Sequence, residues 1–361
     1  MVRCVGNVHL FPRADTDGCV FATHPTFTQL ETLRFPPGYN HYVGTATRFI
    51  LGRVPALKPV VIAFVIFASL NSGLSAKAGD LDKEKDAAKV NQEVLSGGNY
   101  EVEIVRDLPY VEGPEADPRK HKLDLFLPKG KKSFPVVFFI HGGGWRSGDR
   151  KLYGNFGRIF AKNGVGAVII SYRLTPPVTH PAHIEDVAKA FAWTHKNIAK
   201  YGGRPDEIFV TGQSAGGHLA ALLATNEQYL AAESLSLKSI KGVMPMSGIY
   251  LFRPGWMEVV IGKGEKAAES ASPLKHVSGK EPPFLILYAD RDFPGCDKMS
   301  IALNDLLMKN KVESSCGAIK DRNHISIIFK MMFNDADPAT QALLKFMAAH
   351  SKELKLTPKG G

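Results

Sequence analysis

The chain has 361 residues, 44% of them hydrophobic and 22% charged, which is enough apolar material for one large buried core. The formal net charge is +10, but the sequence has no run of five basic residues and no basic stripe with interleaved aromatic residues, so we expect no nucleic-acid partner. The sequence also lacks zinc-type Cys/His spacing, a phosphate-binding glycine loop and internal repeats, which argues against those classes of protein.

The first part of the chain does not resemble a folded domain. Residues 1–53 are polar and interrupted by Pro and Gly, with no sustained helical or strand period. We therefore expect a disordered extension, or a start codon assigned too far upstream. N-terminal sequencing of protein from its native source tests the second explanation, which a mature N-terminus upstream of residue 50 would contradict.

Residues 54–78 have the features of a secretory signal peptide. An apolar run at 59–70 follows Lys58 and is followed by the small-x-small site Ala76-Lys-Ala78. A run of about 12 residues is too short to span a bilayer, which takes roughly 20. We expect cleavage near Ala78 and export to the periplasm or the extracellular space, without a stable membrane anchor. A buried helix and an uncleaved anchor are the alternatives.

The remaining chain divides into a linker at 79–99, a main domain at 100–352 and a disordered tail at 353–361. Alternating apolar and polar residues at 100–106 and 121–127 predict an antiparallel pair of half-buried strands. Continuous apolar runs predict central strands of a parallel sheet, and they lie at 136–140, 165–170, 208–210, 242–244 and 284–287. Helices are predicted at 184–198, 215–225, 299–308 and 338–347, the last with Asp337 as its N-cap. This alternation predicts an α/β fold.

The segment Gly212-Gln-Ser214-Ala-Gly216 matches G-x-S-x-G, in which the serine is a nucleophile on a sharp turn between a strand and a helix. It follows the apolar run at 208–210 and precedes a predicted helix, which is the context that the motif requires. Glycines two residues before and after the serine keep the turn free of bulk. We therefore predict Ser214 as the nucleophile.

A glycine-rich loop, His141-Gly-Gly-Gly-Trp145, follows the predicted strand that ends at Ile140. Such a loop can direct backbone N–H groups at the oxyanion of an acyl-transfer reaction. We predict that Gly143, Gly144 and Ala215, the residue after the nucleophile, form this oxyanion hole. His141 is expected to brace the loop.

A serine nucleophile needs a base and an acid to activate it. In the fold that carries a G-x-S-x-G turn between a strand and a helix, the expected chain order is Ser, then Asp/Glu, then His. His324 follows a predicted strand near the end of the chain and is our candidate general base. Asp292, in the loop after the run at 284–287, is our candidate for the acid that orients it. Asp290 is the alternative acid, and His218 is predicted to be structural.

Together these motifs resemble the α/β-hydrolase superfamily, and within it the hormone-sensitive-lipase-like and feruloyl-esterase-like carboxylesterases. The marks of those enzymes, HGGGW and GxSAGG, occur here as residues 141–145 and 212–217. Kynurenine formamidases share nearly the same motifs. The resemblance covers about residues 100–350 and implies an α/β-hydrolase fold with a mostly parallel eight-stranded sheet and helices on both faces.

The segment 248–283 is long and carries several apolar side chains, among them Phe252 and Trp256. We expect it to form a small cap over the mouth of the cleft, with Trp145 and Trp256 in the substrate pocket. The alternative is an ordinary surface helix that buries these side chains in the main core.

The sequence therefore predicts a serine hydrolase that cleaves carboxylic esters, small or polymer-linked, through an acyl-enzyme on Ser214, without a metal or organic cofactor. A formamidase or other amidase, a peptidase of related fold, and a non-catalytic binding module on a hydrolase scaffold are the alternatives. Cys296 and Cys316 are either two free thiols or a disulfide that export would permit.

Overall fold

The computed structural model of the chain describes residues 94–358. The expected N-terminal extension (1–53), the signal peptide (54–78) and most of the linker (79–99) lie outside the described residues, so these three remain predictions. Within residues 94–358, no helix is both long enough and apolar enough to cross a membrane.

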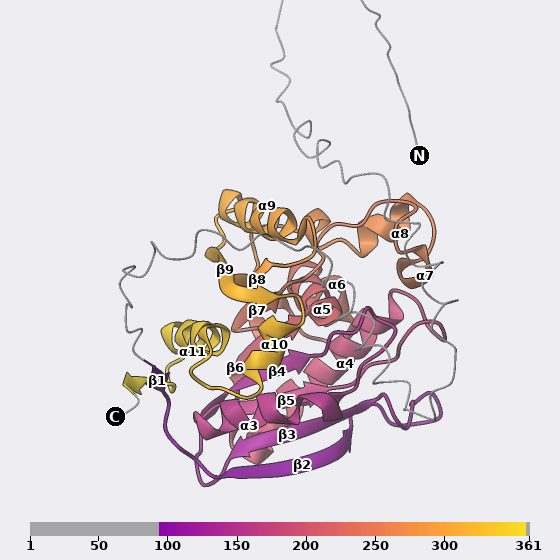
Figure 1. Ribbon diagram of the computed structural model, residues 1–361. Coiled ribbons are helices and arrows are strands. Elements are labelled where there is room, and N and C mark those ends of the chain that lie inside the picture. The colour runs from indigo at the N-terminus through magenta and orange to yellow at the C-terminus, as the bar shows by residue number, and fades with distance from the viewer. Residues whose placement is uncertain (1–93, 359–361) are drawn as a thin grey trace, which may run out of the picture. The chain divides into compact units, whose positions relative to one another are not determined.

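A sheet of eight strands organises the described chain, in the order β2-β3-β5-β4-β6-β7-β8-β9 (Figure 1). The strands are β2 (Val102–Pro109), β3 (Lys122–Pro128), β4 (Phe134–Ile140), β5 (Gly166–Ile170), β6 (Gly203–Gln213), β7 (Gly242–Met246), β8 (Phe284–Arg291) and β9 (Ser314–Asn323). β3 pairs antiparallel with β2 and with β5, and all other neighbouring strands are parallel. This confirms the predicted mostly parallel eight-stranded sheet.

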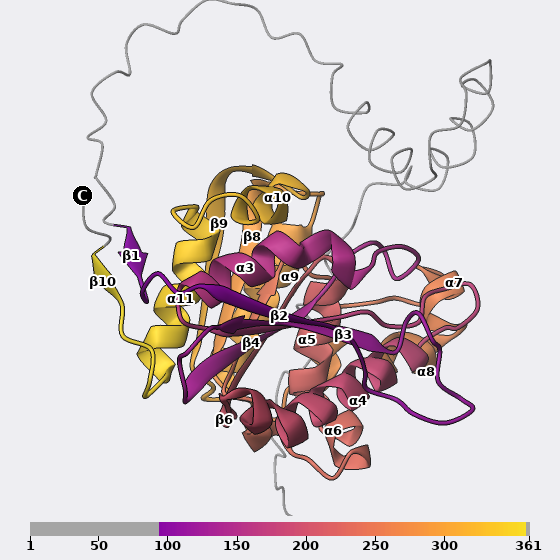
Figure 2. The ribbon, with the colours of Figure 1, turned by 90° about the horizontal axis from the view of Figure 1, so that it is seen from below.

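Helices connect the strands and cover both faces of the sheet. The α-helices are α3 (Gly154–Lys162), α4 (Ala182–Asn197), α5 (Ala215–Thr225), α6 (Gln228–Ala232), α7 (Glu258–Ile261), α8 (Glu265–Ser270), α9 (Cys296–Lys309), α10 (Ser326–Met331) and α11 (Pro338–His350). Short 3-10 helices are η3 (Arg150–Tyr153), η4 (Ile198–Tyr201), η5 (Leu237–Ser239) and η6 (Pro273–Lys275). In Figure 2, α4, α5 and α6 lie on one side of the sheet and α3 and α11 on the other.

All the helices that the sequence predicts are present, as α4, α5, α9 and α11. At the start of α11, the side chain of Asp337 accepts a hydrogen bond from the Ala339 N–H at 2.9 Å, so the predicted N-cap is confirmed. The helices α3 and α6 were not predicted.

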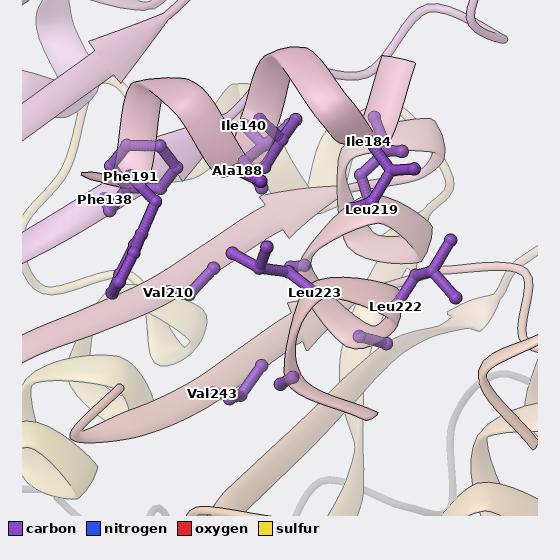
Figure 3. Close-up of a cluster of buried hydrophobic side chains, with 14 of the residues drawn as sticks. Phe138, Ile140, Ile184, Ala188, Phe191, Val210, Leu219, Leu222, Leu223 and Val243 are labelled. Atoms are coloured by element: carbon purple, nitrogen blue, oxygen red, sulfur yellow. The ribbon is translucent and has the colours of Figure 1, made fainter. Parts of the chain in front are cut away.

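The described residues form two core clusters, one on each face of the sheet, and the cluster nearest the predicted site lies between β4, β6 and the helices α4 and α5 (Figure 3). Phe138 and Ile140 on β4 and Val210 on β6 face Phe191 of α4 and Leu223 of α5, and all five are fully buried. Burying a side chain of this size contributes about 1.5–3 kcal/mol. The packing holds the start of α5 firmly against the ends of β4 and β6, and this is where the predicted site lies.

The expected disordered tail at 353–361 is wrong as far as residue 358. Leu354 is 1% exposed and packs in the core on the α11 side of the sheet. Beyond it, β10 (Thr357–Pro358) pairs antiparallel with β1 (Leu95–Ser96), at the end of the predicted linker. The Ser351 hydroxyl also donates to the buried carboxylate of Glu207. These contacts connect distant parts of the chain, so the local sequence carries no sign of them.

Candidate active site

Ser214 occupies the tight turn between β6 and α5. Its backbone has φ 58° and ψ −118°, a strained conformation for a residue with a Cβ, which typically costs 1–3 kcal/mol. An added Cβ on Gly216 would lie 2.0 Å from the carbonyl oxygen of Ile140, and one on Gly212 would lie 2.5 Å from the carbonyl carbon of Gly216. The turn therefore requires both glycines, as the motif predicts.

The structure brings Ser214, His324 and Asp292 together in a chain of hydrogen bonds. His324 Nε2 lies 2.8 Å from Ser214 Oγ, and His324 Nδ1 lies 2.7 Å from Asp292 Oδ1. The Asp292 side chain is 3% exposed and that of His324 is 16% exposed. Burial by itself would raise the pKa of Asp292, but the hydrogen bond and charge of His324, with hydrogen bonds from Ser247 and the Phe293 N–H, hold it below its ordinary value. The carboxylate is therefore ionised at neutral pH.

Asp290, the alternative acid, has a different environment. Its carboxylate accepts hydrogen bonds from the backbone N–H groups of Asp321 and Arg322, each at 2.9 Å. These two residues lie at the end of β9, just before His324. Asp290 therefore shapes the loop that carries the histidine, whereas Asp292 contacts the histidine itself.

The glycine-rich loop lies directly beside the nucleophile. An added Cβ on Gly142 would be 3.3 Å from the Cβ of Ser214. Gly143 and Gly144 have positive φ angles of 121° and 61°, a backbone conformation that residues with a Cβ rarely adopt. Ala215 is the first residue of α5, so its N–H has no acceptor within the helix. These three N–H groups are the predicted oxyanion donors, and that role remains a prediction.

His141 and His218 are both buried and neutral. Burial lowers the pKa of His141 to about 4 and that of His218 to about 3. The ring of His141 stacks on Tyr172 at 4.4 Å and its Nδ1 lies 2.8 Å from the carbonyl oxygen of Gly142, so it braces the glycine-rich loop. His218 Nε2 lies 2.7 Å from the carbonyl oxygen of Ala271, which can only accept, so this nitrogen carries the proton.

Of the predicted pocket residues Trp145 and Trp256, the first is placed differently from what we expected, and the pocket role of the second remains a prediction. Trp145 is 2% exposed, and its Nε1–H donates to His218 Nδ1 at 3.1 Å. Because the indole N–H takes a buried partner, the ring supports the loop from inside instead of lining a pocket surface. Trp256 is half-buried and packs against Phe252, with ring centroids 5.5 Å apart.

The candidate cap at 248–283 contains α7, α8 and η6. Phe252, Val260 and Ile261 are at most 3% exposed and belong to the core on the α4/α5 side of the sheet. The Phe252 ring packs edge-on against His218 at 5.1 Å. The segment is thus anchored in the main core, as the alternative predicted, and its role as a cap over the cleft remains a prediction.

Two positioning contacts were not predicted. The side chain of Gln213 donates to the carbonyl oxygen of His324 at 2.7 Å, and the Ser247 hydroxyl donates to Asp292 at 2.5 Å. Gln213 is the first of the two variable residues of the G-x-S-x-G motif, so its place before the nucleophile was a possible signal. Ser247 has no such signal, because only the sheet brings it to Asp292.

Among residues 94–358, no group of His, Cys, Asp and Glu side chains is arranged to hold a metal ion. Cys296 and Cys316 are both free thiols, which is the first of the two predicted states. Cys296 is buried in α9, and its thiol faces the carboxylate of Asp292.

The sheet order, the nucleophile turn and the hydrogen-bonded Ser-His-Asp chain define an α/β hydrolase with a serine nucleophile site. A family model described as BD-FAE matches residues 123–307, more than half of the chain. The chain therefore belongs to the BD-FAE family.

Curated relatives and solved structures are consistent with this class. The chain is 32% identical over 210 residues to the esterase LipQ of Mycobacterium tuberculosis (52% of this chain, 48% of LipQ). It is 34% identical over 184 residues to the esterase LipC of the same organism (45% of each chain). The chain thus spans about half the length of these curated relatives. The structure of esterase B from Lactobacillus rhamnosis matches with a TM-score of 0.61 and 23% identity, covering 71% of this chain and 88% of that one, which shows the fold.

Proposed function

We propose that this protein is a serine hydrolase that cleaves carboxylic esters. The observation that carries the proposal is the hydrogen-bonded chain from Ser214 through His324 to Asp292, set beside a loop of three glycines. The relatives LipQ and LipC are named as esterases, which supports an ester as the substrate.

The geometry supports a two-step acyl transfer. His324 Nε2 takes the proton of Ser214 as the hydroxyl oxygen attacks the ester carbonyl carbon, and Asp292 stabilises the imidazolium that forms. The N–H groups of Gly143, Gly144 and Ala215 are the donors for the oxyanion. His324 then protonates the leaving alcohol, and a water molecule repeats the sequence on the acyl-enzyme.

The test is hydrolysis of p-nitrophenyl esters from acetate to decanoate by the full chain and by its Ser214→Ala variant. We expect activity on short acyl chains, and a loss on the order of 10⁶-fold in kcat when the nucleophile is removed. A folded protein without activity on any ester would contradict the proposal. N-formylkynurenine would then test the formamidase alternative, and its failure would favour a binding module.

A further inference from the structure

The carboxyl end of β7 makes hydrogen bonds to both Ser214 and Asp292, the two outer residues of the hydrogen-bonded Ser-His-Asp group. The carbonyl oxygen of Met246, the last residue of the strand, accepts a hydrogen bond from the backbone N–H of Ser214 at 2.9 Å. The hydroxyl of the next residue, Ser247, donates to Asp292 Oδ2 at 2.5 Å. Two consecutive residues therefore connect the end of β7 both to the turn that carries Ser214 and to the segment that carries Asp292.

Ser247 is held rigidly in this position. The residue is fully buried, and its own N–H donates to the carbonyl oxygen of Leu287 on β8 at 2.8 Å. Its φ angle is 49°, in the left-handed region that a residue with a Cβ rarely adopts. Such conformations persist where the surrounding structure imposes them, and here the conformation accompanies a side chain directed at the acid.

The hydrogen bonds of Asp292 show why this hydroxyl matters. Oδ1 accepts from His324 and from the Phe293 N–H at 2.9 Å, and Oδ2 accepts from Ser247 and from the Ala289 N–H at 3.1 Å. Both backbone donors belong to the chain segment that carries Asp292: Ala289 lies on β8 and Phe293 in the loop that follows it. The Cys296 thiol of α9 also faces the carboxylate, but a thiol is only a weak donor. Apart from His324, Ser247 is thus the strong donor that reaches the carboxylate from another segment of the chain, the end of β7.

We propose that Ser247 is a positioning residue, which fixes the orientation and charge distribution of the Asp292 carboxylate and thereby acts through His324. This inference rests on the proposed function. Removal of the hydroxyl leaves one carboxylate oxygen with a donor fewer, so the carboxylate turns more freely and becomes more basic. It then attracts the imidazolium of His324 more strongly, and the free enzyme is protonated on His324 at a higher pH.

The experiment compares Ser247→Ala and Ser247→Gly with the unchanged full chain. Both variants lack the hydroxyl, but glycine also relieves the positive φ angle. With p-nitrophenyl acetate, we expect kcat/KM to fall about 10- to 100-fold in both, as for loss of a hydrogen bond to a charged group. We also expect the acidic limb of the pH profile of kcat/KM to move to higher pH, because His324 is protonated more readily.

A matched control is Thr194→Val on α4, which removes another fully buried hydroxyl, one that donates to the Ala190 carbonyl at 2.8 Å. It should leave the acidic limb in place. The proposal is overturned if both Ser247 variants fold and keep the acidic limb of the unchanged chain. It is also overturned if Ser247→Gly is fully active and only Ser247→Ala is impaired, because the backbone conformation alone would then matter.

A readout without substrate separates this inference from the proposed function. A hydrogen-bonded His Nδ1 proton gives a low-field proton NMR signal, which a His324→Gln variant assigns. We expect this signal to shift or disappear in both Ser247 variants even if no ester is hydrolysed. An unchanged signal would reject the role of Ser247, whereas a changed signal without ester hydrolysis would reject only the proposed function.

Discussion

The carboxylates of Asp290, near the end of β8, and Asp292, just after it, are only two residues apart but have different partners. Asp292 receives the hydrogen bond of His324, and Asp290 receives those of the backbone at Asp321 and Arg322. At the level of single residues, the direction of the side chain therefore decides the role: Asp292 contacts the imidazole of His324, and Asp290 holds the backbone that leads to it.

The substitutions Asp292→Asn and Asp290→Asn should therefore have unequal effects on turnover. An amide at 292 no longer stabilises the imidazolium and can favour the wrong tautomer of His324, so we expect kcat to fall on the order of 10⁴-fold. At 290 we expect less than about a 10-fold change in kcat, since an amide oxygen still accepts one of the two backbone hydrogen bonds and the histidine itself is not contacted. The measurement is the steady-state kcat of both variants on the same ester. Equal losses of kcat would contradict the assignment of Asp292 as the acid.

At the level of elements, His218 of α5 connects three segments. It accepts from Trp145 of the glycine-rich loop, donates to the Ala271 carbonyl of the 248–283 segment, and packs against Phe252. The loop, the nucleophile helix and the candidate cap are thus joined through one neutral imidazole. We expect a disturbance of this junction to affect stability and catalysis together.

The variant Trp145→Phe keeps most of the ring but removes the donor to His218 Nδ1. Because a buried acceptor then loses its partner, we expect the free energy of unfolding to fall by about 1–3 kcal/mol. We also expect kcat to fall more than KM changes, since the loop carries the predicted oxyanion donors. Urea unfolding and ester kinetics measure the two effects.

The control for this variant is Trp193→Phe on α4, where the indole is half-buried and packs on Tyr201 with ring centroids 6.4 Å apart. It makes the same chemical change away from the loop. If kcat falls as much in Trp193→Phe as in Trp145→Phe, the hydrogen bond from Trp145 to His218 has no specific effect on the glycine-rich loop, and the prediction is wrong.

At the level of the whole molecule, several buried histidines should make stability depend on pH. Burial lowers the pKa of His141 and His183 to about 4 and that of His218 to about 3, from an ordinary value of 6.5. Below pH 6.5 the unfolded chain therefore binds protons that the folded chain excludes. The stability is fully present above pH 6.5 and is lost as the pH falls toward 4.

We expect each of these histidines to lower the free energy of unfolding by about 2 kcal/mol at pH 5 relative to pH 7. The measurement is the urea midpoint at pH 7, 6 and 5. His183→Gln should reduce the pH dependence, whereas His195→Gln, on the same helix, serves as the matched control. A midpoint that stays constant from pH 7 to pH 5 would show that these side chains accept protons in the folded state.

The local sequence failed to predict elements in which tertiary packing outweighs the intrinsic propensity of the residues for helix or disorder. The helix α3 was not predicted because its glycines weaken the local helical signal. An added Cβ on Gly157 would lie 2.4 Å from the Phe126 ring, so the glycine serves close packing of the helix on β3. The ordered tail has the same explanation, because Leu354 is buried by elements distant in the chain.

The sequence by itself determined the class of fold, the candidate nucleophile Ser214, the candidate base His324 and the glycine-rich loop. Each of these depends on a local pattern: apolar runs for buried strands, glycines for a tight turn, and a fixed chain order for the catalytic groups. Only the tertiary structure decided between Asp290 and Asp292, turned Trp145 inward, and brought Ser247 to the acid. Those outcomes depend on which strand ends lie side by side, and the order of the strands in the sheet is not written in any local stretch of the chain.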